Sequence, residues 1–242
     1  SDLGWRWYLA ATACLILALI AVLAMALWPQ ATRALRLFHL HLNTLGFIGL
    51  SAVGTLQVLM PTVLSGPDPE AAARLRRDLP LFLAGVTTVA TGAALYPPLA
   101  LPGVLLLSIP CWRLLIAWLK RYTLRSMWAD GASAALLAAF FGFLGLLILG
   151  ALHGFSLLDG WDAVPAFVAM FLLPLVTGAL SQLLPVWQSP GANSPLRRDL
   201  RALLITGGRW RGFVFLGGGL LLATGRMEGA WLALAGLLHF VL

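Results

Sequence analysis

Residues 132–153 read ASAALLAAFFGFLGLLILGALH and contain no Asp, Glu, Lys or Arg. A bilayer core of about 30 Å needs about 20 helical residues, so this stretch is long enough to cross a membrane as one helix. The whole chain has the same character, because 60% of its 242 residues are hydrophobic and only 10% are charged. Soluble domains carry about 25% charged residues, and disordered chains are poor in apolar residues. The composition therefore excludes a soluble globular enzyme and a disordered chain, and it predicts a polytopic membrane protein.

Apolar segments bounded by charges or by Pro and Gly clusters give eight predicted spans. They are residues 7–28, 38–60, 80–96, 99–119, 132–153, 163–187, 212–225 and 229–242. Because a helix satisfies its backbone hydrogen bonds within its own segment in lipid, we expect an all-α transmembrane bundle that forms a single membrane domain over 1–242. The sequence has no initiator Met, and its last apolar run stops at Leu242. We therefore expect a processed or partial chain.

The basic residues predict the orientation of the chain in the membrane. Twelve of the 16 Lys and Arg residues fall at the N-terminus or in the loops after spans two, four and six, and three (Arg33, Arg36 and Arg226) fall on the other side. By the positive-inside rule, the N-terminus is predicted to be cytoplasmic, in a bacterial inner membrane. Topology thus accounts for the net charge of +7, and the expected partner is the lipid bilayer, with no nucleic acid.

Two further features are expected to meet the membrane surface. The basic clusters at 74–77 and 197–201 are predicted to touch anionic lipid. Six tryptophans near predicted span ends are predicted to form an aromatic belt. They are Trp5, Trp7, Trp28, Trp128, Trp161 and Trp187.

An internal similarity indicates a duplication. Residues 54–61 read GTLQVLMP and residues 178–185 read GALSQLLP; each is followed by a Pro-, Gly- and Ser-rich stretch and then by Leu-Arg-Arg-Asp-Leu, at 75–79 and 196–200. Both copies run in the same direction across the membrane, which predicts a parallel repeat over 38–119 and 163–242. The alternative is chance recurrence of helix-ending prolines and basic loops.

All four histidines fall at or inside predicted spans: His39, His41, His153 and His239. Ionisable side chains are costly in lipid and are functional candidates by default. On a helix, His39 and His41 lie about 200° apart, so they cannot bind one ion from the same face. Either one could ligate a haem iron from inside the bundle, or the pair is interfacial and the glycines that follow it serve close helix packing.

The spacing around these histidines resembles a known helix. The pattern His39-x-His41-x4-Gly46-Phe47-x6-Gly54-x6-Pro61 is similar to the second helix of haem–copper oxidase subunit I relatives. These include the nitric-oxide-response haem–copper membrane proteins and the membrane portions of copper-oxidase-type chains. In that superfamily, a histidine near the outer end of this helix is an axial ligand of the low-spin haem. The resemblance implies that His39 or His41 binds haem b, and the pattern covers 23 of the 242 residues.

The resemblance also implies a second axial ligand. The superfamily takes this ligand from a late helix in which His precedes an aromatic and then aliphatic residues, and Leu238-His239-Phe240-Val241-Leu242 is similar to its start. The alternative for His239 is a polar group bonded to a neighbouring helix. A complete oxygen- or nitric-oxide-reducing centre needs more histidines than the four present. We therefore do not expect a complete terminal oxidase, and copper is the weaker cofactor prediction.

Two other residues are candidates for the site. His153 ends the fifth predicted span near Asp159 and Asp162; a metal entry route is one reading, and a helix C-terminal cap is the other. Arg113 lies deep in the fourth predicted span, where it either pairs with a haem propionate, by analogy, or snorkels to the inner surface.

Three functions follow from the sequence. The first is a haem-b-binding membrane protein or subunit that passes electrons between the quinone pool and a periplasmic redox partner. The second is a non-enzymatic transporter or metal-handling protein whose duplicated halves enclose a path. The third is a structural subunit that packs against other membrane subunits and binds nothing redox-active.

Overall fold

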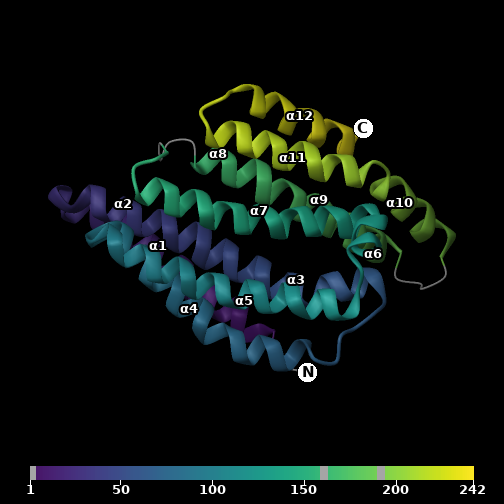
Figure 1. The fold of residues 1–242 in the computed structure, drawn as a ribbon, viewed down its shortest axis with the longest axis horizontal. Helices are drawn as coiled ribbons and strands as arrows, with labels where there is room; N and C mark the ends of the chain where they lie inside the picture. The colour runs from purple at the N-terminus through teal and green to yellow at the C-terminus, as the bar shows by residue number, and fades with distance from the viewer. Residues whose placement is uncertain (1–3, 159–162, 190–193) are drawn as a thin grey trace. The chain divides into compact units, whose positions relative to one another are not determined.

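The computed structural model describes residues 4–158, 163–189 and 194–242, and every regular element in these ranges is a helix (Figure 1). Six helices are long and apolar enough to cross a membrane. They are Trp5–Leu27, Pro29–Leu64, Ala71–Leu95, Pro97–Arg121, Gly131–Gly154 and Ala163–Gln188. The prediction of an all-helical, multi-pass membrane protein is therefore confirmed.

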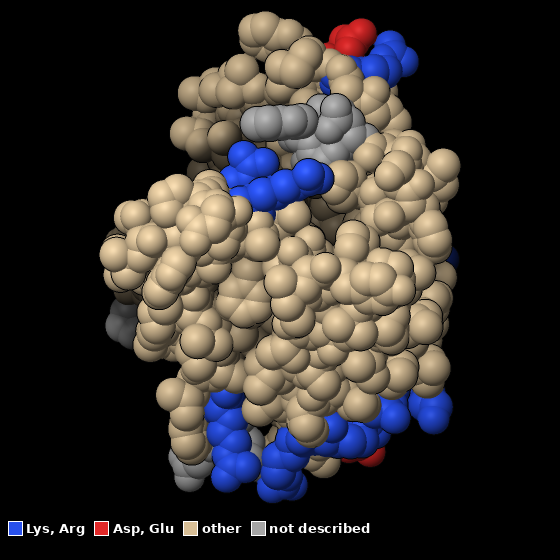
Figure 2. Space-filling view, turned by 90° about the vertical axis from the view of Figure 1, so that its left-hand side faces the viewer, with Lys and Arg blue, Asp and Glu red and all other residues tan. Residues whose placement is uncertain are grey.

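The surface has the character that lipid contact requires. Most of the face shown in Figure 2 carries neither acidic nor basic side chains. Along α1 (Trp5–Leu27), Leu23 and Leu27 are 69% and 70% exposed, and only five of the 23 residues of this helix are buried. A water-facing helix with this composition would be unfavourable, so lipid is the expected surrounding of this surface.

The chain divides into two compact units, which are described separately. The first comprises residues 1–58 and 67–118, and the second comprises residues 59–66 and 119–242.

The first unit is built from two helical hairpins. Its elements are α1 (Trp5–Leu27), η1 (Pro29–Ala31), α2 (Thr32–His41), η2 (Leu42–Gly49), α3 (Leu50–Leu64, whose last turns belong to the second unit), α4 (Ala71–Leu95), η3 (Pro97–Leu99) and α5 (Ala100–Arg121, whose last turn also belongs to the second unit). The segment Pro29–Leu64 is one continuous helical run. It extends the predicted span 38–60 at both ends. Each hairpin turn starts at a proline, because proline disfavours helical backbone in the residue before it and suits the first turn of the next helix.

Trp7 anchors the core of the first unit. Its side chain is fully buried, its Nε1 donates to the carbonyl of Leu75 at 2.9 Å, and its ring lies 5.5 Å from that of Phe82. Gly54 makes room for the indole, because a Cβ there would come within 3.1 Å of the Trp7 Cβ. The prediction that Trp7 belongs to an aromatic belt is therefore wrong, whereas Trp5 is 54% exposed.

The second unit has the same kind of hairpins and an additional short helix. Its elements are α6 (Leu124–Ala129), α7 (Gly131–Gly154), α8 (Ala163–Phe167), η5 (Val168–Leu172), α9 (Leu173–Gln188), α10 (Pro195–Ile205), α11 (Gly208–Ala223) and α12 (Glu228–Val241). Its most buried helix is α7, where every residue from Gly131 to Phe140 is buried. Asp130 caps this helix by accepting hydrogen bonds from the backbone of Ala132 and Ser133 at 2.9 and 3.3 Å. Trp161 lies outside the described residues.

The last two helices are shorter than a typical span. The 16 residues of α11 and the 14 of α12 reach about 24 and 21 Å, less than a bilayer core of about 30 Å. They pack closely, since a Cβ on Gly218 would lie 2.8 Å from the Gly229 carbonyl oxygen. Among the described residues, six helices rather than eight meet the length and composition of a span.

Candidate functional site

His39 is held by a neighbouring helix. It lies partly buried on α2, and its Nδ1 is 2.9 Å from the carbonyl oxygen of Ala18 on α1. A carbonyl oxygen only accepts hydrogen bonds, so this contact requires the proton on Nδ1 and leaves the lone pair on Nε2. A backbone carbonyl bonded in this way is a common orienting partner of metal-ligating histidines. The Nδ1–H of His39 thus bonds to the backbone of α1, and Nε2 is left outside this contact.

His41 has a partner on its own helix instead. Its Nδ1 lies 2.8 Å from the carbonyl oxygen of Leu37, one turn earlier on α2. The same argument places the proton on Nδ1 and the lone pair on Nε2. The two rings thus bond to different helices, as their predicted separation of about 200° on one helix requires.

A π-helical segment follows directly after His41. It spans Leu42–Gly49 (η2) and is continued by α3. The hydroxyl of Thr44 donates to the carbonyl of Leu40 at 2.7 Å, a bond that weakens regular helix geometry. Gly46 faces α1 here, and a Cβ on it would come 2.7 Å from that of Cys14. π-Helical insertions occur frequently at functional sites, so the histidine pair and this segment together form the candidate site of the first unit.

His239 lies in a different chemical environment. Its Nδ1 is 3.4 Å from Nη1 of Arg211, a group that only donates, so Nδ1 accepts and the proton sits on Nε2. Arg211 is 3% exposed and also donates to the carbonyls of Leu204, at 2.7 Å, and Thr206. Its guanidinium lies 5.0 Å from the ring centre of Phe240. His239 is thus joined to a guanidinium that binds the C-terminal carbonyls of α10.

Arg113 is bonded to a buried carboxylate. Its Nη1 lies 3.1 Å from Oδ1 of Asp78, which also accepts from Nε of Arg77 at 2.9 Å. The side chain of Asp78 is 2% exposed, whereas those of Arg77 and Arg113 are 53% and 41% exposed. The sequence analysis did not predict this three-residue cluster, because Asp78 lies 35 residues from Arg113.

His153 closes the end of α7. Its Nδ1 lies 2.9 Å from the carbonyl oxygen of Leu158, a contact within five residues that fits a local cap of the helix end. Asp159 and Asp162, which were predicted beside it, lie outside the described residues.

The described residues do not gather the donors of a metal site held by protein alone. Among the described residues there is no group of three or more His, Cys, Asp or Glu that could hold a metal ion. A protein-ligated metal usually needs three or four such donors. A haem needs only one or two axial side chains, because the macrocycle supplies the remaining donors. His39 and His41 each meet that smaller requirement.

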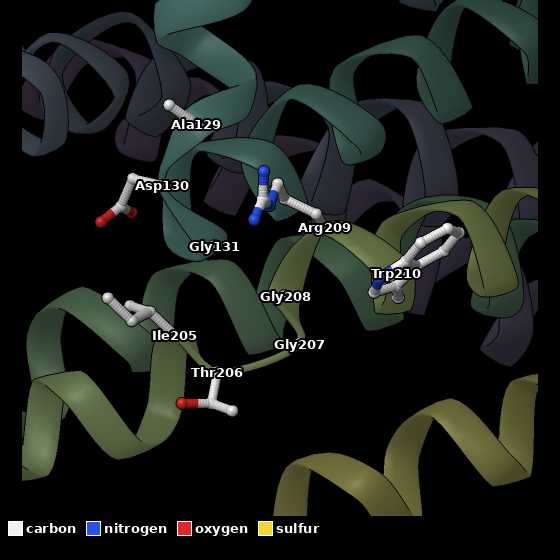
Figure 3. A pocket seen from close by; sticks show the side chains of 9 residues that line it. All are labelled: Ala129, Asp130, Gly131, Ile205, Thr206, Gly207, Gly208, Arg209 and Trp210. Carbon is white, nitrogen blue, oxygen red and sulfur yellow. The ribbon is translucent and has the colours of Figure 1, made fainter.

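A cavity of about 610 Å³ in the second unit was not predicted (Figure 3). It lies where α6 meets α7 and where α10 turns into α11, and in Figure 3 the Asp130 carboxylate turns away from the Arg209 side chain. Gly207 makes this turn with φ of +67°, a left-handed conformation that glycine adopts without strain. The sequence feature that could have indicated this turn is the pair Gly207-Gly208, because adjacent glycines often interrupt a helix. The cavity is lined by Ala129, Asp130, Gly131, Ile205, Thr206, Gly207, Gly208, Arg209 and Trp210.

Two buried polar atoms in the first unit were also missed. Among the residues that the structure describes, Oε1 of Gln57 and Nε of Arg74 have no hydrogen-bond partner. The rest of the Arg74 side chain is well paired, with Nη2 2.6 Å from Oδ2 of Asp68. An unsatisfied buried group costs about 1–3 kcal/mol. The sequence does not show whether a single polar residue within a helix will find a hydrogen-bond partner in the folded chain.

No family model, curated protein or solved structure matches this chain.

Proposed function

We propose that this chain is a haem-b-binding membrane protein related to haem–copper oxidase subunit I, with His39 as an axial ligand. The observation that carries the proposal is the 2.9 Å contact between Nδ1 of His39 and the carbonyl of Ala18, which leaves Nε2 with its lone pair. A bound haem would supply the one-electron redox step. The chain would pass electrons between the quinone pool and a periplasmic acceptor.

His39 is preferred over His41 because its orienting partner lies on another helix. The contact with Ala18 depends on the packing of α1 against α2, so tertiary structure fixes the ring. His41 bonds to the carbonyl of Leu37 within its own helix and is the alternative ligand. A ligand whose ring is held by its surroundings loses little freedom on binding.

The environment of His239 disfavours it as the second ligand. To present an Nε2 lone pair, His239 would have to move its proton to Nδ1 and lose the hydrogen bond from Arg211. Arg113, in turn, would have to leave Asp78 to pair with a propionate. The proposal therefore needs one axial ligand from this chain and leaves the second open to His239 or another subunit.

The proposed architecture is a parallel duplication over 38–119 and 163–242, with eight spans in all. Gly54 faces Trp7 in the first unit, and Gly178 faces Ala135 in the second; these glycines are separated by 124 residues (178 − 54 = 124). At the same offset, Gly46 faces Cys14, and Met170 faces Gly142.

Both long helices also contain a π-helical segment at the matching place. The segment Leu42–Gly49, shifted by 124 residues, falls on 166–173, and the second segment is Val168–Leu172. Pro61 and Pro185 follow at the same offset, and both lie inside a helix. Matching contacts, insertions and prolines support a common origin more strongly than the short shared strings do. In this architecture α11 and α12 are the seventh and eighth spans.

The proposed location is the bacterial inner membrane, with the N-terminus in the cytoplasm. The uneven distribution of Lys and Arg between alternate loops supports this orientation. His39 then lies toward the periplasmic side, where an electron acceptor or another membrane subunit would bind.

The test is an absorption spectrum of the full chain purified in detergent after expression with haem supply. We expect a Soret band and an α-band that sharpens on reduction. His39→Ala should remove most of the haem, and His41→Ala should retain it. His153→Ala is the matched control, because that ring bonds to the carbonyl of Leu158 at its own helix end.

Three outcomes would contradict the proposal. Equal haem retention in the His39 and His41 variants would argue against axial ligation from α2. Purified protein without a chromophore, but with bound copper or with solute uptake in vesicles, would favour a metal-handling protein or a transporter. Purified protein that shows no chromophore, no bound copper and no solute uptake would favour a structural subunit.

A further inference from the structure

Helix α10 (Pro195–Ile205) presents an unpartnered amphipathic face. None of its eleven residues is buried, and Leu196 and Leu203 are 60% and 68% exposed. At 100° per residue, Leu196, Leu200 and Leu203 lie on one side of the helix and its arginines lie on the other. A short helix of this kind is typical of a segment that lies in the plane of a membrane surface.

Two arginines of α10 are available to an external anion. The side chains of Arg197 and Arg198 make no hydrogen bond or ion pair with the described residues, whereas that of Arg201 bonds to Asp130 at 2.8 Å and to Gln182 at 3.2 Å. Asp199, which could neutralise them, is exposed. The helix thus has one arginine that anchors it to its own unit and two whose charge is unmatched.

Interfacial aromatic residues flank the helix on both sides. Trp187 at the end of α9 is 65% exposed, and Trp210 at the start of α11 is 74% exposed. Arg209 beside Trp210 is exposed too (Figure 3). Tryptophan is enriched at the headgroup level of membranes, and basic residues there attract anionic lipid.

We propose that α10 lies in the membrane interface and binds anionic phospholipid through Arg197 and Arg198. Leu196 and Leu203 enter the acyl region, and the guanidinium groups bind headgroup phosphates. The proposed orientation of the chain places this contact in the inner leaflet. The lipid preference itself depends neither on that orientation nor on haem binding.

The experiment measures lipid retained by the full-length chain. The protein is reconstituted in nanodiscs of phosphatidylcholine with phosphatidylglycerol, released, and analysed by native mass spectrometry. Because each basic residue near an anionic surface contributes about 1 kcal/mol, the double variant Arg197→Gln/Arg198→Gln should retain phosphatidylglycerol with roughly thirtyfold lower preference. The matched control is Arg77→Gln from the first unit, whose arginine is paired with Asp78.

A second measurement follows the depth of the helix. Leu203→Cys is labelled with a fluorophore that brominated lipids quench; the native Cys14 and Cys111 are buried. Quenching at this position, together with loss of phosphatidylglycerol only in the double variant, supports the proposal. Unchanged phosphatidylglycerol in the double variant, an equal loss in Arg77→Gln, displacement of the lipid by inorganic phosphate, or an unquenched label would each overturn it.

Discussion

The pentapeptide Leu-Arg-Arg-Asp-Leu occurs once in each unit and has opposite surroundings. In the first unit it lies within the long helix α4, where Leu75 and Asp78 are 4% and 1% exposed. In the second unit it lies on the short helix α10, where Asp199 is exposed. The same letters therefore form an internal ion cluster in one unit and a surface in the other.

The difference comes from the residues that follow the pentapeptide. Helix α4 continues through Pro80 to Leu95, so its first turns are fixed on the same axis as its membrane-spanning part. The second copy is followed by a break at Thr206 and Gly207, after which α11 starts on a new axis. Arg211 then binds the carbonyls that the break exposes. A helix break thus decides whether a charged segment is packed or released to the surface.

The largest effect on the free energy of unfolding is expected at a glycine contact that differs between the two units. A Cβ on Gly142 would collide with the Met170 carbonyl, which is backbone, whereas a Cβ on Gly46 would meet the side chain of Cys14. Because backbone cannot move aside as a side chain can, Gly142→Val should lower the free energy of unfolding by about 3 kcal/mol or more. Gly46→Val should cost clearly less. Unfolding in mixed detergent, followed by tryptophan fluorescence, measures both.

Gly150→Val on the same helix, α7, is the control for this pair. A Cβ on Gly150 would meet no described atom within 4 Å beyond the neighbouring backbone of its own helix. If Gly142→Val proved no more destabilising than Gly150→Val, the close contact between α7 and η5 would be disproved.

A second prediction compares the two aspartates of the pentapeptide. Asp78→Asn removes the charge between Arg77 and Arg113 and should cost about 1.5–3 kcal/mol, as expected for a buried charge-assisted hydrogen bond. Asp199→Asn alters an exposed side chain and should change stability by less than about 0.5 kcal/mol. The same unfolding assay applies to both variants. Equal costs would mean that the two copies do not differ in burial.

The smallest effect concerns the helix break between α10 and α11. Gly207 and Gly66 both have positive φ, of +67° and +98°. A Cβ on Gly207 would meet the imidazole of His239, whereas a Cβ on Gly66 would meet no described atom within 4 Å. Both Ala variants carry the backbone strain of a left-handed residue. Gly207→Ala should cost about 1 kcal/mol more, the price of pushing His239 off its rotamer. A difference of zero in thermal unfolding would show that His239 does not pack on this turn.

The sequence was informative where chain length and polarity decide the outcome. The charge-free stretch 132–153 is contained in α7, Gly131–Gly154. The boundaries were less accurate, because α4 begins at Ala71 rather than near residue 80. Two of the charges that seemed to exclude residues 71–79 from the helix, those of Arg74 and Asp78, are buried in ion pairs within the unit. Hydropathy counts charges singly and cannot detect such pairing.

The candidate site was only partly predictable. The opposite facing of His39 and His41 follows from helical geometry alone and agrees with their separate partners. The partners themselves did not follow, since Ala18 lies 21 residues from His39 and Asp78 lies 35 from Arg113. Trp7 likewise satisfies its indole nitrogen with a carbonyl 68 residues away.

Composition and periodicity determined that this chain is helical and membrane-embedded, because the cost of exposing apolar surface to water or bare backbone to lipid depends only on the local segment. Tertiary structure decided which histidine nitrogen carries its proton, which aspartate is buried and which pentapeptide faces outward. Each of these depends on a partner atom that the folded chain brings from far along the sequence, and no local pattern encodes that encounter.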